Sequence, residues 1–296
     1  MGLVRARRRL GIPRGPSTLI AASAPLAAFR LGPVGKLRAA LTWAAHMWAY
    51  KEAFEIPHDV PERQRRRLIL DWPIAVDARI APPNPPTLRL QRRFRDPPRL
   101  TILDYLSTLV YAFWDLEPHL ALAWILARDE RRFVRAASRL AVTFDLTLVG
   151  YWAVPQAPPW WASEEAGQMG GEVRRVAPEV LRELRGRPRP ALSHYRGANP
   201  WAAMPSDHFA TALMTALVLA DHDPRAGLAA ATYALLLGFA LVYLGEHYVV
   251  DLIAGAALVG AVEIALRPRS APNLWVRAVR RVCELTARID DLRAIA

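Results

Sequence analysis

Residues 204–266 read MPSDHFATALMTALVLADHDPRAGLAAATYALLLGFALVYLGEHYVVDLIAGAALVGAVEIAL. The segment holds three apolar runs, at 203–220, 226–244 and 249–266, separated by short polar breaks. Each run is close to the roughly 20 residues that an α-helix needs to cross a bilayer. A soluble domain rarely carries three such runs in succession, so the sequence predicts a membrane protein with several spans.

Two histidines stand where these runs meet polar sequence. His208 opens the first run, and His247 follows the second, four residues before Asp251. That spacing places His247 and Asp251 on one helix face, where the carboxylate can fix the tautomer of the imidazole and stabilise its charged form. Because one span begins near His208 and the next, returning span ends near His247, both histidines are predicted on the same side of the membrane.

The remaining sequence predicts an all-α, polytopic membrane protein with a six-transmembrane-helix core and interfacial or amphipathic helices around it. Residues 1–60 form a basic tail and a first membrane anchor or interfacial helix, and residues 61–100 form a Pro/Arg-rich loop. Residues 101–267 form the membrane core, and residues 268–296 form a basic amphipathic tail.

Within the core, a helix break is expected at Glu117-Pro118, a basic loop at 128–139, and a polar loop at 162–200 with a short helix at 179–185. Six aromatic residues are predicted to lie at the membrane interface: Trp43, Trp48, Tyr50, Trp152, Trp160 and Trp161.

The formal charge is +12, and all but Lys36 and Lys51 of the 39 basic residues are arginine. This bias fits a GC-rich bacterial genome and contact with anionic lipid headgroups. The arginines flank apolar helices and do not alternate with aromatic residues, which disfavours a nucleic-acid partner. The single cysteine, Cys283, excludes an internal disulfide and a multi-cysteine metal site.

The positive-inside tendency places the basic segment 128–139, the DHDPR turn at 221–225 and the C-terminal tail on the cytoplasmic side. The arginine-rich loops at 60–99 and 172–196 run against a simple charge count, but long loops carry little weight in this rule. We therefore predict a plasma-membrane protein whose histidines face outward.

Three segments together resemble a known family: YWAVPQAPPWW at 151–161, NPWAAMPSDHFA at 199–210 and YLGEHYVVDLIAGA at 243–256. They resemble the type 2 phosphatidic acid phosphatase superfamily, and most closely its inositol phosphorylceramide synthase-like branch. The resemblance implies that His247 attacks phosphorus and forms a phosphohistidine, that Asp251 orients it, and that His208 protonates the leaving oxygen. It implies no cofactor and no metal, and His208, His247 and Asp251 have no further metal ligand at helical spacing.

The sequence departs from the phosphatase pattern, which carries Ser-Arg ahead of the tyrosine. Those positions are Ala240 and Leu241 here, so one phosphate-binding arginine is missing. This departure favours transfer over hydrolysis and leaves the cationic phosphate clamp to other residues. The substrate-binding candidates are Ser206, Asp207, Tyr243, Arg174, Arg175, Arg196 and His194.

Each candidate also has a plain structural interpretation. Ser206 and Asp207 are equally suited to capping the helix that follows them. His194 and the arginines suit a solvated, charged loop.

The resemblance implies a lipid phosphotransferase that moves a phosphoryl-linked headgroup from a phospholipid donor to a lipid alcohol. The alternatives are a lipid phosphate phosphatase and a non-enzymatic lipid-binding or transport protein.

Overall fold

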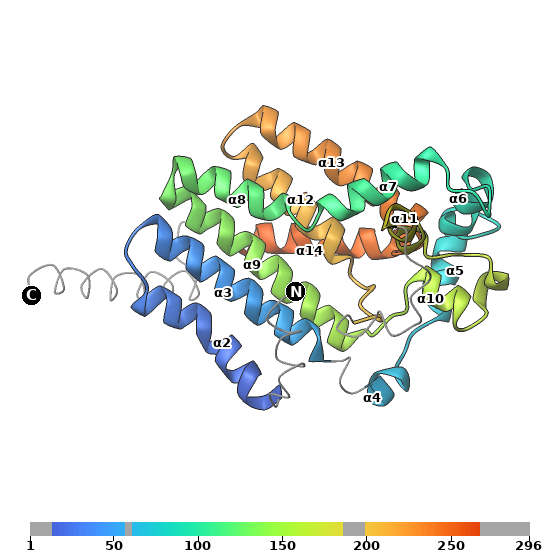
Figure 1. Cartoon of the computed structure of the whole chain (residues 1–296), viewed down its shortest axis with the longest axis horizontal. Helices are drawn as coiled ribbons and strands as arrows, with labels where there is room; N and C mark the ends of the chain where they lie inside the picture. The colour runs from blue at the N-terminus through green and yellow to red at the C-terminus, as the bar shows by residue number, and fades with distance from the viewer. Residues whose placement is uncertain (1–13, 57–60, 186–198, 267–296) are drawn as a thin grey trace, which may run out of the picture.

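The computed structural model describes residues 14–56, 61–185 and 199–266. Within these ranges the chain is all-α, apart from isolated β-bridges such as those that join Gln156 to Ile69 and Ala202 (Figure 1). This confirms the all-α part of the predicted fold class. The predicted tail at 268–296 and most of the predicted N-terminal tail lie outside the described residues.

One set of helices lies side by side along one axis of the molecule, and mostly shorter helices gather at one end (Figure 1). The helices that lie side by side are α2 (Arg14–Leu31), α3 (Lys36–Phe54), α8 (Glu117–Arg128), α9 (Glu130–Ala153), α12 (Asp207–Ala220), α13 (Pro224–Tyr243) and α14 (Val249–Leu266). The others are α4 (Pro61–Arg65), α5 (Asp71–Ile80), α6 (Pro86–Phe94), α7 (Ile102–Phe113), α10 (Pro159–Glu164), α11 (Val176–Arg185) and the 3-10 turn η2 (Gln168–Gly171).

Tight turns join the hairpins α8–α9 and α12–α13, and aspartates cap the helices that follow. The Asp129 side chain accepts hydrogen bonds from the Arg131 and Arg132 backbone N–H groups. Asp223 does the same for Arg225, with Pro224 at the first helical position. The first N–H groups of a helix lack partners within the helix. The aspartate side chains accept hydrogen bonds from such groups, and Pro224 has no N–H that needs a partner. The DHDPR turn therefore stops one helix and starts the next.

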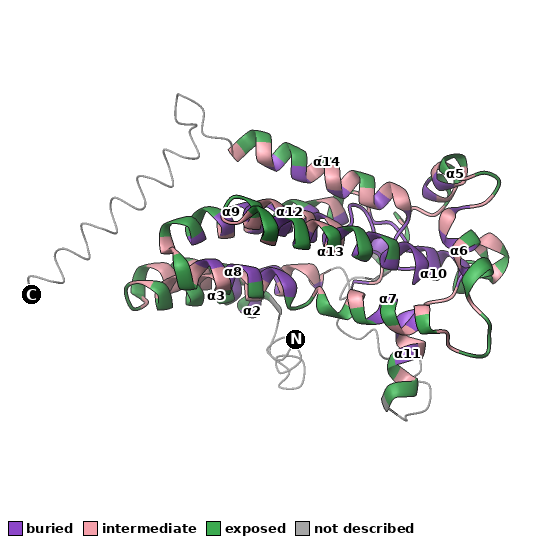
Figure 2. Cartoon of the chain, turned by 90° about the horizontal axis from the view of Figure 1, so that it is seen from above, coloured by how far each residue is buried: buried purple, intermediate pink, exposed green. Residues whose placement is uncertain are grey.

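The main apolar core joins four helices, α8, α9, α12 and α14. Its larger buried members are Leu122, Ile125, Phe133, Leu140, Met214, Val218, Val259 and Val262. Figure 2 shows a second concentration of buried residues around α10, at the end where the short helices gather. The two histidine motifs lie at that end.

Among the residues that the structure describes, two helices, α13 and α14, are long and apolar enough to cross a membrane, which falls short of the predicted six-span core. Both expose large apolar side chains, among them Leu228 and Leu235 on α13 and Ile253 on α14. Helices α7 and α12 are apolar but shorter, at 12 and 14 residues.

Two expected loops are helical, and this corrects the sequence-based prediction. Residues 130–139, expected in a basic loop, form the first turns of α9, because Asp129 caps the helix immediately after α8 ends. The Pro/Arg-rich segment 61–100 contains α4, α5 and α6. Its prolines do not exclude helix, because Pro86 and Pro73 lie in the first turns of α6 and α5, where a missing N–H costs little.

Two other local predictions are confirmed. The helix is interrupted between Phe113, where α7 ends, and Glu117, where α8 begins, and Pro118 lies in the first turn of α8. The helix expected at 179–185 forms the greater part of α11.

The predicted aromatic belt is wrong in two places. Trp160 is 2% exposed and Tyr50 is 5% exposed, so both rings pack inside the protein. Trp152, 39% exposed, remains at the surface. Composition alone does not separate an interfacial aromatic from a buried one, because both occur at helix ends near polar groups.

Candidate active site

The two histidines and the aspartate predicted from the sequence form one continuous chain of contacts. His208 Nδ1 lies 3.2 Å from His247 Nε2, and His247 Nδ1 lies 3.3 Å from Asp251 Oδ2. His247 is 2% exposed and Asp251 is fully buried. With its Nδ1–H donated to Asp251, His247 presents the unprotonated Nε2, which is the nucleophilic form of an imidazole.

Asp251 is held by three further contacts. Its Oδ1 accepts a hydrogen bond from Gln156 Nε2 at 2.6 Å, and its Oδ2 accepts one from the Tyr248 backbone N–H at 2.9 Å. Its backbone carbonyl accepts the Ser206 N–H at 3.0 Å, which joins the start of α12 to the start of α14. Gly255 permits this approach, since a Cβ there would lie 2.9 Å from the Ser206 carbonyl oxygen. The carboxylate is therefore fixed before any substrate arrives.

The first turn of α14 depends on a distant aspartate. Asp77, on α5, accepts the backbone N–H groups of Val249 and Val250 at 2.8 and 3.0 Å. Burial raises the pKa of Asp77 to about 6, against the lowering effect of these two hydrogen bonds. The helix that carries Asp251 therefore begins at a cap supplied by a segment more than 170 residues earlier.

Aromatic residues at the end of α7 and just beyond it enclose His208. The Trp114 ring centroid lies 4.2 Å from that of His208, and the Tyr111 centroid lies 5.2 Å away. Trp114 Nε1 donates to Thr211 Oγ1 at 2.8 Å, which fixes the indole one turn along α12 from His208. These aromatic rings therefore restrict the orientations that the His208 imidazole can adopt.

Ser206 and Asp207, both predicted substrate contacts, serve as anchors for α12. Ser206 Oγ accepts the Phe209 N–H, as a helix cap does. The Asp207 carboxylate accepts from the Tyr50 hydroxyl at 2.6 Å and from Thr147 Oγ1 at 3.0 Å. The contact of Ser206 is therefore that of a helix cap, whereas the Asp207 carboxylate ties the start of α12 to side chains of α3 and α9.

The adjacent arginines predicted for the phosphate clamp point to different surroundings. Arg175 forms a bidentate pair with Glu246, with Nε 2.7 Å from Oε1 and Nη2 3.0 Å from Oε2. Its guanidinium lies 4.7 Å from the Trp160 ring centroid, and its charge acts on Tyr111, which borders His208. Glu246 directly precedes His247, so Arg175 lies beside the histidine pair.

The loop that carries Glu246 is built for close contact. Gly245 adopts a φ of 80°, and a Cβ there would lie 2.8 Å from the Arg174 carbonyl oxygen. The Gly245 carbonyl accepts the Trp160 backbone N–H at 3.0 Å. The left-handed conformation and the space both require glycine, so the loop is locked to α10 and to the segment before α11.

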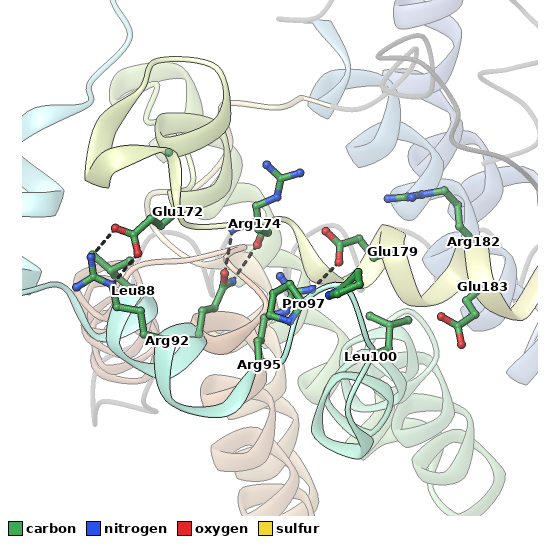
Figure 3. A pocket seen from close by; sticks show the side chains of 13 residues that line it. Leu88, Arg92, Arg95, Pro97, Leu100, Glu172, Arg174, Glu179, Arg182 and Glu183 are labelled. Atoms are coloured by element: carbon green, nitrogen blue, oxygen red, sulfur yellow. Dashed lines mark hydrogen bonds and ion pairs between the residues drawn. The ribbon is translucent and has the colours of Figure 1, made fainter.

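Arg174 instead lines a separate charged cavity of about 970 Å³ between α6 and α11 (Figure 3). Arg92 pairs with Glu172 and Arg95 pairs with Glu179 along its wall. Neither histidine lines this cavity. Tyr243, a predicted substrate contact, is fully buried, and its hydroxyl donates to Asp104 at 2.6 Å.

Two further candidates, His194 and Arg196, lie outside the described residues. Across residues 14–56, 61–185 and 199–266 no group of three or more His, Cys, Asp or Glu side chains is arranged to hold a metal ion.

The sequence-based reasoning missed Gln156, Asp77, Trp114 and Glu246. Gln156 lies inside YWAVPQAPPWW and Glu246 inside YLGEHYVVDLIAGA, two of the quoted segments, and this is the signal that could have found them. Asp77 and Trp114 are ordinary residues of a helix and a loop whose roles come from tertiary contacts.

A model of the PAP2 superfamily matches residues 87–265, more than half of the chain and the part that carries the histidine relay. The chain therefore belongs to the PAP2 superfamily. Members of this superfamily are phosphatases or phosphotransferases, so the protein is an enzyme that acts on phosphate esters. No curated protein and no solved structure matches the chain in the corresponding searches.

Proposed function

We propose that this protein is an integral membrane lipid phosphotransferase that works through a phosphohistidine at His247. The observation that carries the proposal is the chain of contacts His208–His247–Asp251, in which His247 and Asp251 are buried, with a cation, Arg175, beside it. A fixed carboxylate, an unprotonated imidazole nitrogen and a second imidazole supply the nucleophile and the acid–base group that a double displacement needs.

In the first step, His247 Nε2 attacks phosphorus, and the P–O bond to the donor lipid's alcohol breaks. His208 gives a proton to that departing oxygen. In the second step, a lipid hydroxyl attacks phosphorus, His208 takes the hydroxyl's proton, and the P–N bond breaks. Arg175 stabilises the charge on the phosphoryl oxygens.

The direct contact between the histidines has a mechanical consequence. At 3.2 Å between Nδ1 and Nε2 there is no space for phosphorus between the two rings. The His208 ring must turn against Trp114 and Tyr111 to admit the phosphoryl group, and catalytic groups in empty sites often tighten into the reactive geometry only with substrate.

Transfer to a lipid alcohol is favoured over hydrolysis by the two positions that depart from the phosphatase pattern. Ala240 and Leu241 are 1% and 0% exposed and pack in apolar clusters, so no phosphate contact arises there. The sequence resemblance to inositol phosphorylceramide synthases points the same way. We extend the proposal to a six-span core with the histidines on the outer face of the plasma membrane, supported by the apolar exposed faces of α13 and α14.

The decisive experiment supplies a phospholipid with a labelled headgroup phosphate and a lipid alcohol to the full-length protein in nanodiscs. Label that moves to the lipid alcohol supports transfer, and label released into water supports the hydrolase alternative. Acid-labile label trapped on His247, and lost in His247→Ala, supports the covalent intermediate. Full transfer activity in both His247→Ala and His208→Ala would overturn the proposed phosphohistidine mechanism.

A further inference from the structure

The chain has two lysines among 39 basic residues, and they occupy different environments. Lys36 Nζ donates to the Ala127 carbonyl at 2.7 Å, which satisfies a free acceptor at the end of α8. Lys51 lies in the last turn of α3 and is half-buried, with its ammonium 5.1 Å from the Phe54 ring centroid. Among the residues that the structure describes, no carboxylate forms an ion pair with Lys51.

The turn that carries Lys51 is fixed to the start of α12. The neighbouring Tyr50 donates its hydroxyl to Asp207, the residue before His208, at 2.6 Å. Phe54, on which the ammonium rests, packs 6.0 Å from Tyr50 and 5.9 Å from Tyr151, measured between ring centroids.

Tyr151 in turn accepts the Asp207 backbone N–H at 3.1 Å through its hydroxyl. These three aromatic rings therefore hold Lys51 at the end of the helix that presents His208. The positive charge of Lys51 acts on both Asp207 and His208.

A half-buried ammonium that rests on an aromatic ring but forms no ion pair is only partly compensated for the hydration that it loses. Such a group is stabilised when an anion arrives from outside, which makes it a candidate for ligand binding. Arg175 is already engaged by Glu246 in a bidentate pair. Lys51 forms no ion pair with the described part of the chain and offers a compact, flexible point charge.

We propose that Lys51 binds the phosphate of the substrate, as a second cation beside Arg175. This inference rests on the proposed function and names a residue of its phosphate site. It also gives a role to the α2–α3 hairpin, which precedes the residues 87–265 that match the superfamily. In this view, the N-terminal hairpin completes the charge of the active site.

The test measures binding of inorganic phosphate to the full-length protein in detergent, by calorimetry, together with KM and kcat for the labelled phospholipid. Lys51→Gln should weaken phosphate binding by about tenfold, the effect of losing one charge-assisted contact, and should raise KM. Lys51→Arg should restore most of the affinity, because it keeps the charge. Lys36→Gln removes the other lysine and should leave phosphate affinity and KM unchanged.

Melting temperatures establish that each variant is folded, and Lys51→Met replaces Lys51→Gln if the amide variant is unfolded. Phosphate affinity within about twofold of wild type in Lys51→Gln or Lys51→Met would overturn the inference, as would a wild-type protein that does not bind phosphate. If His247-dependent transfer persists while phosphate affinity is unchanged in the variant, Lys51 is excluded and the proposed function stands. If phosphate affinity falls but wild type transfers no headgroup, the phosphate site stands and the proposed reaction fails.

Discussion

The two ends of the helix bundle are held together by different kinds of contact. At the histidine end, buried hydrogen bonds from Ser206 and Gln156 converge on Asp251. At the far end, Arg139 on α9 pairs with Asp221 after α12 and with Glu263 on α14. The Asp221 side chain is 60% exposed there, whereas Asp251 is fully buried.

This difference separates contacts that fix the positions of the catalytic groups from contacts that hold the helices of the bundle together. The Arg139 side chain is 9% exposed, but its partners Asp221 and Glu263 are 60% and 26% exposed, so these ion pairs are open to solvent on the carboxylate side and are partly screened by salt. A buried polar network must be satisfied in full, so it permits one arrangement of its members. We therefore expect changes at the histidine end to act on catalysis, and changes at the far end to act on stability alone.

The largest effect is expected from Asp251→Asn. The amide keeps the shape but can no longer stabilise a positively charged His247, and it can reverse the preferred tautomer of the ring. We expect kcat for headgroup transfer to fall on the order of 10³–10⁴-fold, as carboxylate–histidine pairs behave elsewhere, with a normal circular dichroism spectrum. Arg139→Gln is the matched control at the far end, and an Asp251→Asn enzyme with near-normal kcat would contradict the proposed relay.

A smaller loss is expected from Gln156→Ala. The variant removes the 2.6 Å hydrogen bond to Asp251 Oδ1 and leaves the histidines in place. Groups that orient a catalytic carboxylate from behind typically contribute about 10–100-fold. Steady-state kinetics should show this loss in kcat with KM little changed, whereas an equal rise in KM would indicate that Gln156 contacts substrate instead.

The contrast between the two ends also explains what the sequence could predict. The pairing of His247 with Asp251 follows from a spacing of four on a helix, and the position of His208 follows from the order of the apolar runs. Both features follow from the order and spacing of residues along the chain, so they can be predicted without knowledge of the tertiary packing. The caps at Asp129 and Asp223 are local as well, and they explain why residues 130–139 are helical and not a loop.

The other partners could not be read from the sequence, because tertiary packing alone brings them together. Gln156 reaches Asp251 across 95 positions, and Asp77 reaches Val249 across 172. Arg174 and Arg175 are adjacent, so their sequence context is the same. Arg174 nevertheless lines the charged cavity between α6 and α11, whereas Arg175 lies beside the histidines. The orientation of the segment before α11, fixed by Gly245, makes that choice.

Removing the cap that Asp77 provides at the histidine end should lower the stability of the protein modestly. Asp77→Ala removes both hydrogen bonds to the first turn of α14, and loss of a helix cap typically costs about 0.5–2 kcal/mol. Thermal unfolding in detergent should therefore show a lower melting temperature.

Ionisation of Asp77 should also make stability depend on pH. The folded-state pKa is about 6, above the ordinary value of 3.8, so the folded protein binds more protons than the unfolded chain between these values. The contribution of this group is therefore full below pH 3.8 and is lost as pH rises through 6. Asp77→Asn does not ionise, so its melting temperature relative to wild type should rise across that window. A difference that stays constant with pH would show that Asp77 is ionised throughout.

The smallest effect is expected from Arg139→Gln at the far end. The substitution loosens the contacts to Asp221 and Glu263 at once, and partly exposed ion pairs contribute about 1 kcal/mol or less. We expect a slightly lower melting temperature at low salt, a smaller difference at high salt because screening weakens the wild-type pairs, and unchanged kcat and KM. A clear loss of kcat would mean that the far end transmits strain along α12 or α14 to the histidines. In that case the separation between catalytic geometry and cohesion would fail, and the bundle would have to be treated as one coupled unit.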